Sequence, residues 1–270
     1  MRSFAFSDSA LARRLERAES AANASFVEAR ARFMPAVGAM WIDVDGTWAM
    51  FDGVGSPCTQ TFGFGLFSTP RDDQLDAIES FFSSRQSGVM HEVSPLADPS
   101  TLSLLGARGY LPIEASSVMH RPIDAAIVGP STPDVRVRVI TPDEVAMWAS
   151  ASVRGWGDFP ELGDFMRDIG TVMGRSRNTA CFVAEIDGVV AATAALSTHE
   201  DVALLTGAST IPDYRGRGAQ NALLQARIAY AASVGCDLAQ MVAQPGGSSQ
   251  RNAERQGFRI AYTRMKWGKK

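Results

Sequence analysis

The run Pro212-Asp-Tyr-Arg-Gly-Arg-Gly-Ala-Gln220 stands between an apolar, strand-like stretch and a long helical one, and it constrains this chain more than any other feature. A strand that turns through two glycines into a helix directs several backbone N–H groups at one point, beside the positive end of the helix dipole. A side chain at Gly216 or Gly218 would hold the backbone away from an anion, and the two arginines of the run can form bidentate bonds to phosphate. The run therefore predicts a site for phosphate oxygens.

The spacing of the two glycines differs from that of two common phosphate loops. It is neither the GxxxxGK(S/T) of nucleotide triphosphatases nor the GxGxxG of dinucleotide-binding folds, and no strand-helix-strand alternation surrounds it. It resembles the pyrophosphate loop of the GNAT superfamily of N-acetyltransferases, whose pattern is Arg/Gln-x-x-Gly-x-Gly/Ala. Arg215 and Gly218 match this pattern. Gln220 stands at its last position, which leaves open how closely the end of the loop approaches a phosphate.

The order of elements after the loop also resembles the family. The residue pattern predicts a helix over 221–233, a strand over 236–243, a short helix over 250–255 and a last strand over 259–267. The segment Asn252-Ala-Glu-Arg-Gln-Gly-Phe258 resembles the closing motif of the family, in which an asparagine, here Asn252, helps to hold the pantetheine arm. The resemblance covers about residues 135–270.

Helical periodicity predicts two further details. Residues 9–33 are rich in Ala, Arg and Glu, with apolar residues at helical spacing, and predict an amphipathic helix or pair of helices on the first half of the chain. In the helix over 221–233, the apolar positions leave Gln225 and Arg227 on the face that we expect to be exposed.

The composition limits which class of protein this chain can belong to. The 270 residues are 46% hydrophobic and 20% charged, which suits one large domain or two of ordinary size. A net charge of -3 and a pI near 5.7 argue against a general nucleic-acid binder. No apolar run approaches the roughly 20 residues that a membrane helix needs. Because the start also lacks the apolar core of a signal peptide, we expect a cytoplasmic protein with no membrane partner.

Potential metal ligands are scattered along the sequence. The cysteines and histidines lie far apart and form no CxxC, HxH or HxxxH pair; they are Cys58, Cys181, Cys236, His91, His120 and His199. We therefore predict no metal site.

The first half of the chain repeats the second in outline. The segment Trp41–Gly46 parallels Val183–Gly188, and both end in an Asp-Gly pair typical of a tight hairpin turn. Residues 121–133 then contain prolines and a glycine, which are typical of a connection between domains. We expect an α+β fold of two GNAT-like domains: a degenerate copy over 1–127, a linker over 128–133 and a GNAT N-acetyltransferase domain over 134–270. The alternative is that the first half is an unrelated α+β domain.

By resemblance, each copy is a mixed, mostly antiparallel sheet flanked by helices, with splayed parallel central strands in the C-terminal copy. The first copy differs at the phosphate loop, because Asp72 and Asp73 stand before its helix. These carboxylates favour a helix N-terminus but would repel a pyrophosphate. We therefore expect acetyl-coenzyme A (acetyl-CoA) to bind only to the second copy.

The resemblance also implies where acetyl-CoA lies. It would occupy a cleft between strands over about 204–211 and 236–243, where backbone groups at Ala208 and Thr210 pair with pantetheine. An N–H at the end of the first strand would stabilise the oxyanion that forms when an amine attacks the thioester directly in a ternary complex. The pyrophosphate would rest on the amides of Arg215, Gly216, Arg217, Gly218, Ala219 and Gln220.

No catalytic side chain is assigned from the sequence. Many relatives carry a tyrosine just before the final Gly-Phe, where this chain has Ala253, and several place a glutamate on the strand before the loop, in the neighbourhood of Leu204. Glu200 and Asp201 lie in a predicted hairpin, where we expect a solvated pair. A base that acts through water, or an amine that arrives deprotonated, would need neither group. If the missing groups mean lost chemistry, the alternative is an acyl-CoA-binding sensor or scaffold.

The acceptor is predicted to be a primary amine of an unidentified small molecule or peptide. Family members select it largely through the loop between the first two helices, which corresponds here to residues 154–162. Trp156 and Phe159 would form an aromatic wall, and Asp158 would attract a cationic amine. The alternative for the same residues is an aromatic helix-helix connection that closes the core.

Overall fold

The computed structural model describes residues 6–123, 134–157 and 162–269. These residues form two units, which are described separately. The N-terminal unit contains the described residues up to Arg121 together with those from Gln240 onward, and the central unit contains the described part of Pro122–Ala239. The predicted linker over 128–133 lies outside the described residues.

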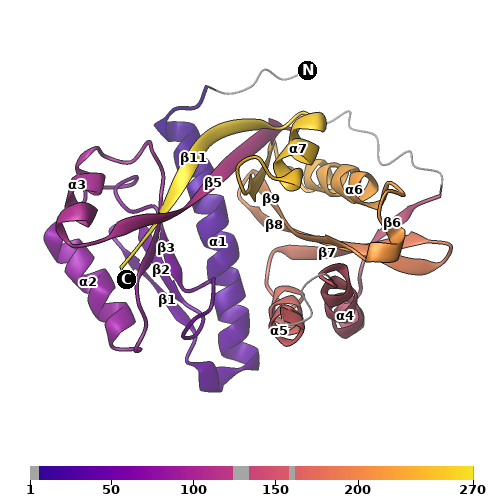
Figure 1. Cartoon of the computed structure of the whole chain (residues 1–270), viewed down its shortest axis with the longest axis horizontal. Helices are drawn as coiled ribbons and strands as arrows, with labels where there is room; N and C mark the ends of the chain where they lie inside the picture. The colour runs from indigo at the N-terminus through magenta and orange to yellow at the C-terminus, as the bar shows by residue number, and fades with distance from the viewer. Residues whose placement is uncertain (1–5, 124–133, 158–161, 270) are drawn as a thin grey trace. The chain divides into compact units, whose positions relative to one another are not determined.

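The N-terminal unit is a mixed sheet with flanking helices (Figure 1). Its sheet has the strand order β1-β2-β3-β4-β11-β5, in which β3 and β4 are parallel and the other neighbouring pairs are antiparallel. Its elements are α1 (Ser9–Phe33), β1 (Met40–Val44), β2 (Thr47–Phe51), β3 (Gln60–Phe62), α2 (Asp72–Ser83), β4 (Met90–Val93), α3 (Ser100–Ala107), β5 (Leu111–Pro122), α7 (Ser248–Arg255) and β11 (Arg259–Gly268). The core of this unit includes Phe64, Ile78 and Leu105, all fully buried.

The central unit is an antiparallel sheet of order β9-β8-β7-β6. Figure 1 shows α6 on one side of β7 and β8, with α4 and α5 on the other. Its elements are β6 (Arg136–Val139), η2 (Pro142–Glu144), α4 (Val145–Gly155), α5 (Gly163–Met173), β7 (Thr179–Ile186), β8 (Val189–His199), β9 (Val202–Thr210), η4 (Pro212–Tyr214) and α6 (Ala219–Ser233). The chain then passes into the N-terminal unit within β10 (Leu238–Ala243). The sequence thus predicted the fold class correctly at the level of an α+β fold in which helices flank a mixed sheet.

Both predicted Asp-Gly hairpins are present. Asp45 and Gly46 join β1 to β2 with φ of 50° and 86°, and Asp187 and Gly188 join β7 to β8 with φ of 53° and 76°. Two successive positive φ angles define the turn whose twist matches paired strands, and Asp-Gly tolerates them well. From each hairpin the chain continues in the same order, through a strand, a helix, a strand and a helix.

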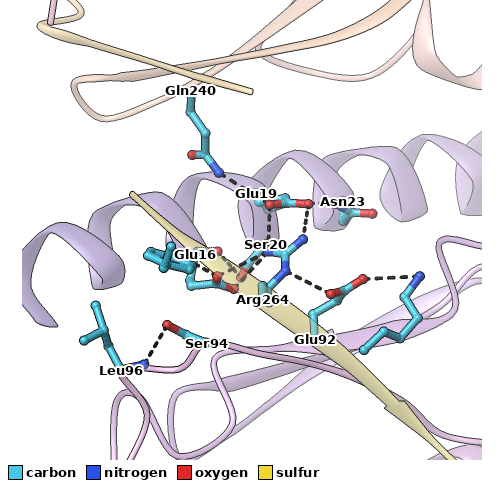
Figure 2. A network of polar contacts seen from close by, with 11 residues as sticks. Glu16, Glu19, Ser20, Asn23, Glu92, Ser94, Leu96, Gln240 and Arg264 are labelled. Carbon is cyan, nitrogen blue, oxygen red and sulfur yellow. Dashed lines mark hydrogen bonds and ion pairs between the residues drawn. The ribbon is translucent and has the colours of Figure 1, made fainter. Parts of the chain in front are cut away.

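The last strand, β11, belongs to the N-terminal unit and not to the domain in which the sequence placed it. Residues 240–270 were expected in one domain with 134–239, but β11 pairs with both β4 and β5 of the N-terminal unit. Arg264 of β11 is 1% exposed, and its guanidinium contacts carboxylates from α1 and β4 (Figure 2). The distances are 3.1 Å to Glu16, 2.8 Å to Glu19 and 2.9 Å to Glu92. These contacts and the strand pairing assign the C-terminal segment to the N-terminal unit.

The predicted N-terminal helix is a single helix, α1 (Ser9–Phe33). It starts at Asp8, whose Oδ1 accepts a hydrogen bond from the Leu11 N–H at 2.9 Å. Among the described residues, no helix has the length and apolar character needed to cross a bilayer.

Candidate functional site

Strand β9 carries a bulge near the predicted site. Between its residues Thr206 and Ser209, which both pair with β8, β9 has two residues, Gly207 and Ala208, against one on β8. Gly207 has a φ of 61°, the left-handed value that glycine adopts readily. A bulge of this kind leaves an extra residue outside the ladder, and Ala208 is exposed. The sequence singled out Ala208 but did not predict the bulge, for which the glycine before it was the available signal.

The end of β9 presents backbone groups on two edges. The Ile211 N–H donates to the Ala191 carbonyl at 2.9 Å, toward β8. Because alternate residues of a strand direct their N–H groups to opposite edges, the Thr210 N–H faces the edge away from β8. That orientation is the one that the predicted pairing of Thr210 with pantetheine requires.

The segment after β9 is a glycine turn at the start of α6, as the sequence predicted. Gly216 and Gly218 have φ of 76° and 84°, and Gly218 is the N-cap of α6. A Cβ built on Gly216 would meet no heavy atom within 4 Å, so this side of the turn is open. The first amides of a helix have no partners within it, and the macrodipole adds roughly half a positive charge there. The geometry suits an anion.

The two arginines of the turn make different contacts. Arg217 is half-exposed, and its guanidinium bonds to Asp187 at 2.9 Å, in a surface pair of the kind that contributes little to stability. Arg215 donates to the backbone carbonyls of Thr210 and Gly155, each at a long 3.4 Å. Arg215 therefore links the turn to β9 and α4 in this structure, while Arg217 lies at the surface.

Gln220, the departure from the family pattern, folds back onto β9. Its Nε2 donates to the Ser209 carbonyl at 2.9 Å and to the Thr210 Oγ1 at 2.8 Å. A long side chain at this position is therefore accommodated, because it is directed toward the end of the strand. Ala219 is buried as the first residue of α6.

Arg227 of α6 is buried, which contradicts its predicted exposure. Only 3% of its surface is exposed, and its Nη1 donates to the carbonyls of Ala195 at 3.1 Å and Thr206 at 3.3 Å. Periodicity alone placed Arg227 on the polar face, because arginine counts as a surface residue. The sequence held no signal for backbone carbonyls that an arginine would reach.

The end of α4 lies tightly against β9. A Cβ on Gly155 would overlap the side chain of Ser209 and come within 3.1 Å of the Thr210 nitrogen, so a glycine is required there. Trp156 is the C-cap of α4 and is 39% exposed. The two other predicted acceptor residues, Asp158 and Phe159, lie outside the described residues.

The candidate acid and base groups that the structure describes lie in different parts of the chain. Tyr262 is buried in the N-terminal unit, where its hydroxyl donates to Glu16 at 2.8 Å, and burial raises its pKa. Glu200 and Asp201 occupy the turn between β8 and β9, as predicted, and Glu200 is exposed. Tyr214 is next to the glycine turn, with the Arg217 guanidinium 5.7 Å from its ring centre.

The remaining predicted site residue, Asn252, belongs to a different unit from the glycine turn. It is exposed on α7 of the N-terminal unit, whereas Ala208, Thr210 and the turn belong to the central unit. Across the described ranges, no group of three or more His, Cys, Asp or Glu side chains could hold a metal ion.

The part of the chain that holds the bulged strand and the glycine turn matches the model of a known family. Residues 148–258 match the Acetyltransferase (GNAT) family. A comparison with curated protein sequences gives no match. The match to GNAT acetyltransferases includes β9, the glycine turn, α6 and α7.

Solved structures show the GNAT fold over most of the chain. A GCN5-related N-acetyltransferase from Kribbella flavida has a TM-score of 0.62 at 17% identity, covering 91% of this chain and 95% of that chain. A tandem GNAT protein from the clavulanic acid biosynthesis pathway has a TM-score of 0.60 at 16% identity, covering 90% and 86%. A GCN5-related N-acetyltransferase from Sphaerobacter thermophilus has a TM-score of 0.51 at 18% identity, covering 78% and 71%.

Proposed function

We propose that the central unit binds acetyl-CoA and transfers its acetyl group to a primary amine. The observation that carries this proposal is the turn of Gly216 and Gly218, whose left-handed dihedrals lead directly into the N-terminus of α6. The match of residues 148–258 to the GNAT acetyltransferases supports acyl transfer from acetyl-CoA. The acceptor is an amine of a small molecule or a peptide.

The pyrophosphate of acetyl-CoA would bind to the amides from Arg215 to Gln220. The residues present fit this group, because the turn offers helix N-terminal amides, open space beside Gly216 and the half-exposed cation of Arg217. The pantetheine arm would pair with the edge of β9 at Ala208 and Thr210.

The bulge of β9 would supply the main catalytic group for the reaction. An amine attacks the thioester carbonyl carbon and forms a C–N bond, and the carbonyl oxygen becomes an oxyanion. The carbonyl then re-forms as the C–S bond breaks, and the thiolate leaves and takes up a proton. A backbone N–H at the bulge would donate to the carbonyl oxygen as it becomes negative, which is the main catalytic contribution of this chain. No side chain is assigned as base or acid, and the amine would lose its proton to water.

The tandem organisation is part of the proposal. The order of elements from β1 to α3 repeats from β7 to α7, which supports a degenerate GNAT-like copy in the first half. At the start of its helix α2, Asp72 and Asp73 provide negative charge, so this copy would not bind a pyrophosphate. A single acetyl-CoA is expected per chain.

Isothermal titration and a thiol-release assay test this function together. Acetyl-CoA should bind at one site per chain and release thiol with at least one member of an amine panel. Two sites would contradict the assignment of the first copy. Binding without turnover by any amine would favour the alternative, an acyl-CoA sensor or scaffold. This alternative is considered because no side chain is assigned as acid or base.

The glycine turn is tested by Gly218→Glu, with Gly235→Glu as its control. Both glycines have positive φ, 84° and 89°, and they lie at opposite ends of α6, so the backbone strain is similar. Gly218→Glu should lower acetyl-CoA affinity by about a hundredfold or more, because it adds bulk and negative charge beside the pyrophosphate. The control should bind normally. Normal affinity in a folded Gly218→Glu variant would exclude this turn as the phosphate site.

A further inference from the structure

The buried Arg227 is bonded to neutral backbone groups. Its guanidinium donates to the carbonyls of Ala195 at 3.1 Å, Thr206 at 3.3 Å and Leu223 at 3.3 Å. Burial lowers its pKa to about 9. At neutral pH the side chain is still protonated, and among the described residues of the central unit no carboxylate forms an ion pair with this buried charge.

Such a charge is costly for a folded protein. Taking a guanidinium out of water is unfavourable, and hydrophobic residues of similar size often serve stability equally well or better in buried positions. The neighbours of Arg227 on α6, Leu224 and Ile228, are apolar and buried. A leucine or methionine would therefore fill this place without the cost, and the arginine requires an explanation other than stability.

The carbonyls that Arg227 contacts lie beside the bulge of β9. Ala195 and Thr206 form the last pair of the β8–β9 ladder before Gly207 and Ala208 interrupt it. A bulge disrupts the ladder locally. Arg227 donates to one carbonyl on each of the two strands at this interruption, and so holds the strands together where their own pairing is broken.

We propose that Arg227 is a positioning residue that fixes the bulge of β9. It acts through Thr206 and Ala195, and it keeps the amide of Ala208 in the geometry in which it meets the thioester oxygen. This inference rests on the proposed acetyl transfer. The protonated guanidinium also adds positive potential beneath the place where the oxyanion forms, and this potential is strong because the surroundings exclude water.

The test compares Arg227→Met and Arg227→Lys with Gln225→Met, a substitution on the same helix. Arg227→Met removes the charge and the donors at similar volume. The relief of the buried charge should offset the loss of the hydrogen bonds to the carbonyls, so this variant should keep a melting temperature close to that of the wild type. Its kcat should fall by about tenfold or more while the KM for acetyl-CoA changes by less than about threefold. Arg227→Lys keeps a charge but lacks the planar guanidinium, so its kcat should lie between those of the wild type and Arg227→Met. Gln225→Met should match the wild type.

Hydrogen exchange of the ligand-free protein gives a readout that does not depend on activity. In Arg227→Met, the amides of residues 206–210 should exchange about tenfold faster or more, whereas those of β7 should not change. If the wild type neither binds nor turns over acetyl-CoA, the proposed function fails, and this exchange comparison alone decides whether Arg227 fixes the bulge.

Three results would overturn the inference. The first is unchanged exchange at 206–210 in Arg227→Met, and the second is unchanged kcat in a wild type that is active. The third is a loss of kcat that parallels equal losses in acetyl-CoA affinity and melting temperature, which would make Arg227 a general core residue. If Arg227→Met does not fold, the same three measurements on Arg227→Lys decide the question.

Discussion

Replacing Glu16 with glutamine should change how the stability of this protein depends on pH. Glu16 is fully buried on α1, where it accepts hydrogen bonds from the Tyr262 hydroxyl at 2.8 Å and from Arg264 at 3.1 Å. Burial raises its pKa from 4.5 to about 7, against the lowering effect of Arg264, and the carboxylates of Glu19 and Glu92 raise it further. Figure 2 shows Glu16, Glu19 and Glu92 gathered around the one guanidinium.

The sign and the magnitude follow from linkage. Because the folded-state pKa lies above the unfolded one, the folded protein binds this proton more tightly, so the stabilising contribution is complete below pH 4.5 and is lost as the pH rises through 7. For a shift of this size, the free energy of unfolding contributed by Glu16 falls by about 2.5 kcal/mol between pH 5 and pH 8. Glutamine does not titrate, so its contribution stays constant over that range.

The assay is urea unfolding followed by tryptophan fluorescence at several pH values between 5 and 8. As the pH rises from 5 to 8, the free energy of unfolding of Glu16→Gln should increase by about 2.5 kcal/mol relative to that of the wild type. The exposed Glu254→Gln serves as the control and should give a curve parallel to that of the wild type. Parallel curves for Glu16→Gln and the wild type would refute the reasoning, because they would mean that Glu16 remains ionised beside Arg264 even at pH 5.

Three further outcomes are expected. Gly155→Ala should lower the free energy of unfolding by about 1–3 kcal/mol in thermal or urea unfolding, because its Cβ overlaps Ser209, and a neutral result would show that α4 can move away from β9. Asp187→Asn should raise acetyl-CoA affinity about twofold to threefold in titration, because it releases Arg217 from a competing carboxylate, and weaker binding would count against a phosphate role for that arginine. Trp156→Ala should raise the acceptor KM while acetyl-CoA affinity stays nearly constant, and a joint loss of both with a lower melting temperature would identify Trp156 as a core residue.

Features set by neighbouring residues could be predicted from the sequence. The Asp-Gly pairs at Gly46 and Gly188 specify their hairpins, because few other residues accept successive positive φ angles. The same reasoning predicted the turn at Gly216 and Gly218 and the helix that follows it. Helix α1 was predicted, as one helix or a pair of helices, from its composition and periodicity. In each case the physical cause acts within a few residues of the chain.

Interactions between distant residues were decided only by the tertiary structure. The sequence assigned β11 to the domain it follows, yet its pairing partners are β4 and β5, and the carboxylates around Arg264 lie more than a hundred residues earlier in the chain. Nothing local to an extended, half-apolar segment specifies which strand it will pair with, because any sheet edge of matching pattern offers the same backbone groups.

The burial of Arg227 has the same origin. Its helix could be predicted, but the two carbonyls that it contacts are supplied by a bulge between strands β8 and β9, and the bulge exists only once those strands are paired. Likewise, Gln220 departs from the family pattern in the sequence, and only the folded position of Thr210 shows where its side chain goes. The sequence alone determined where the glycine turn lies, because glycine dihedrals are a local property. Which side chains support that turn depended on strand pairing, which is a property of the whole fold.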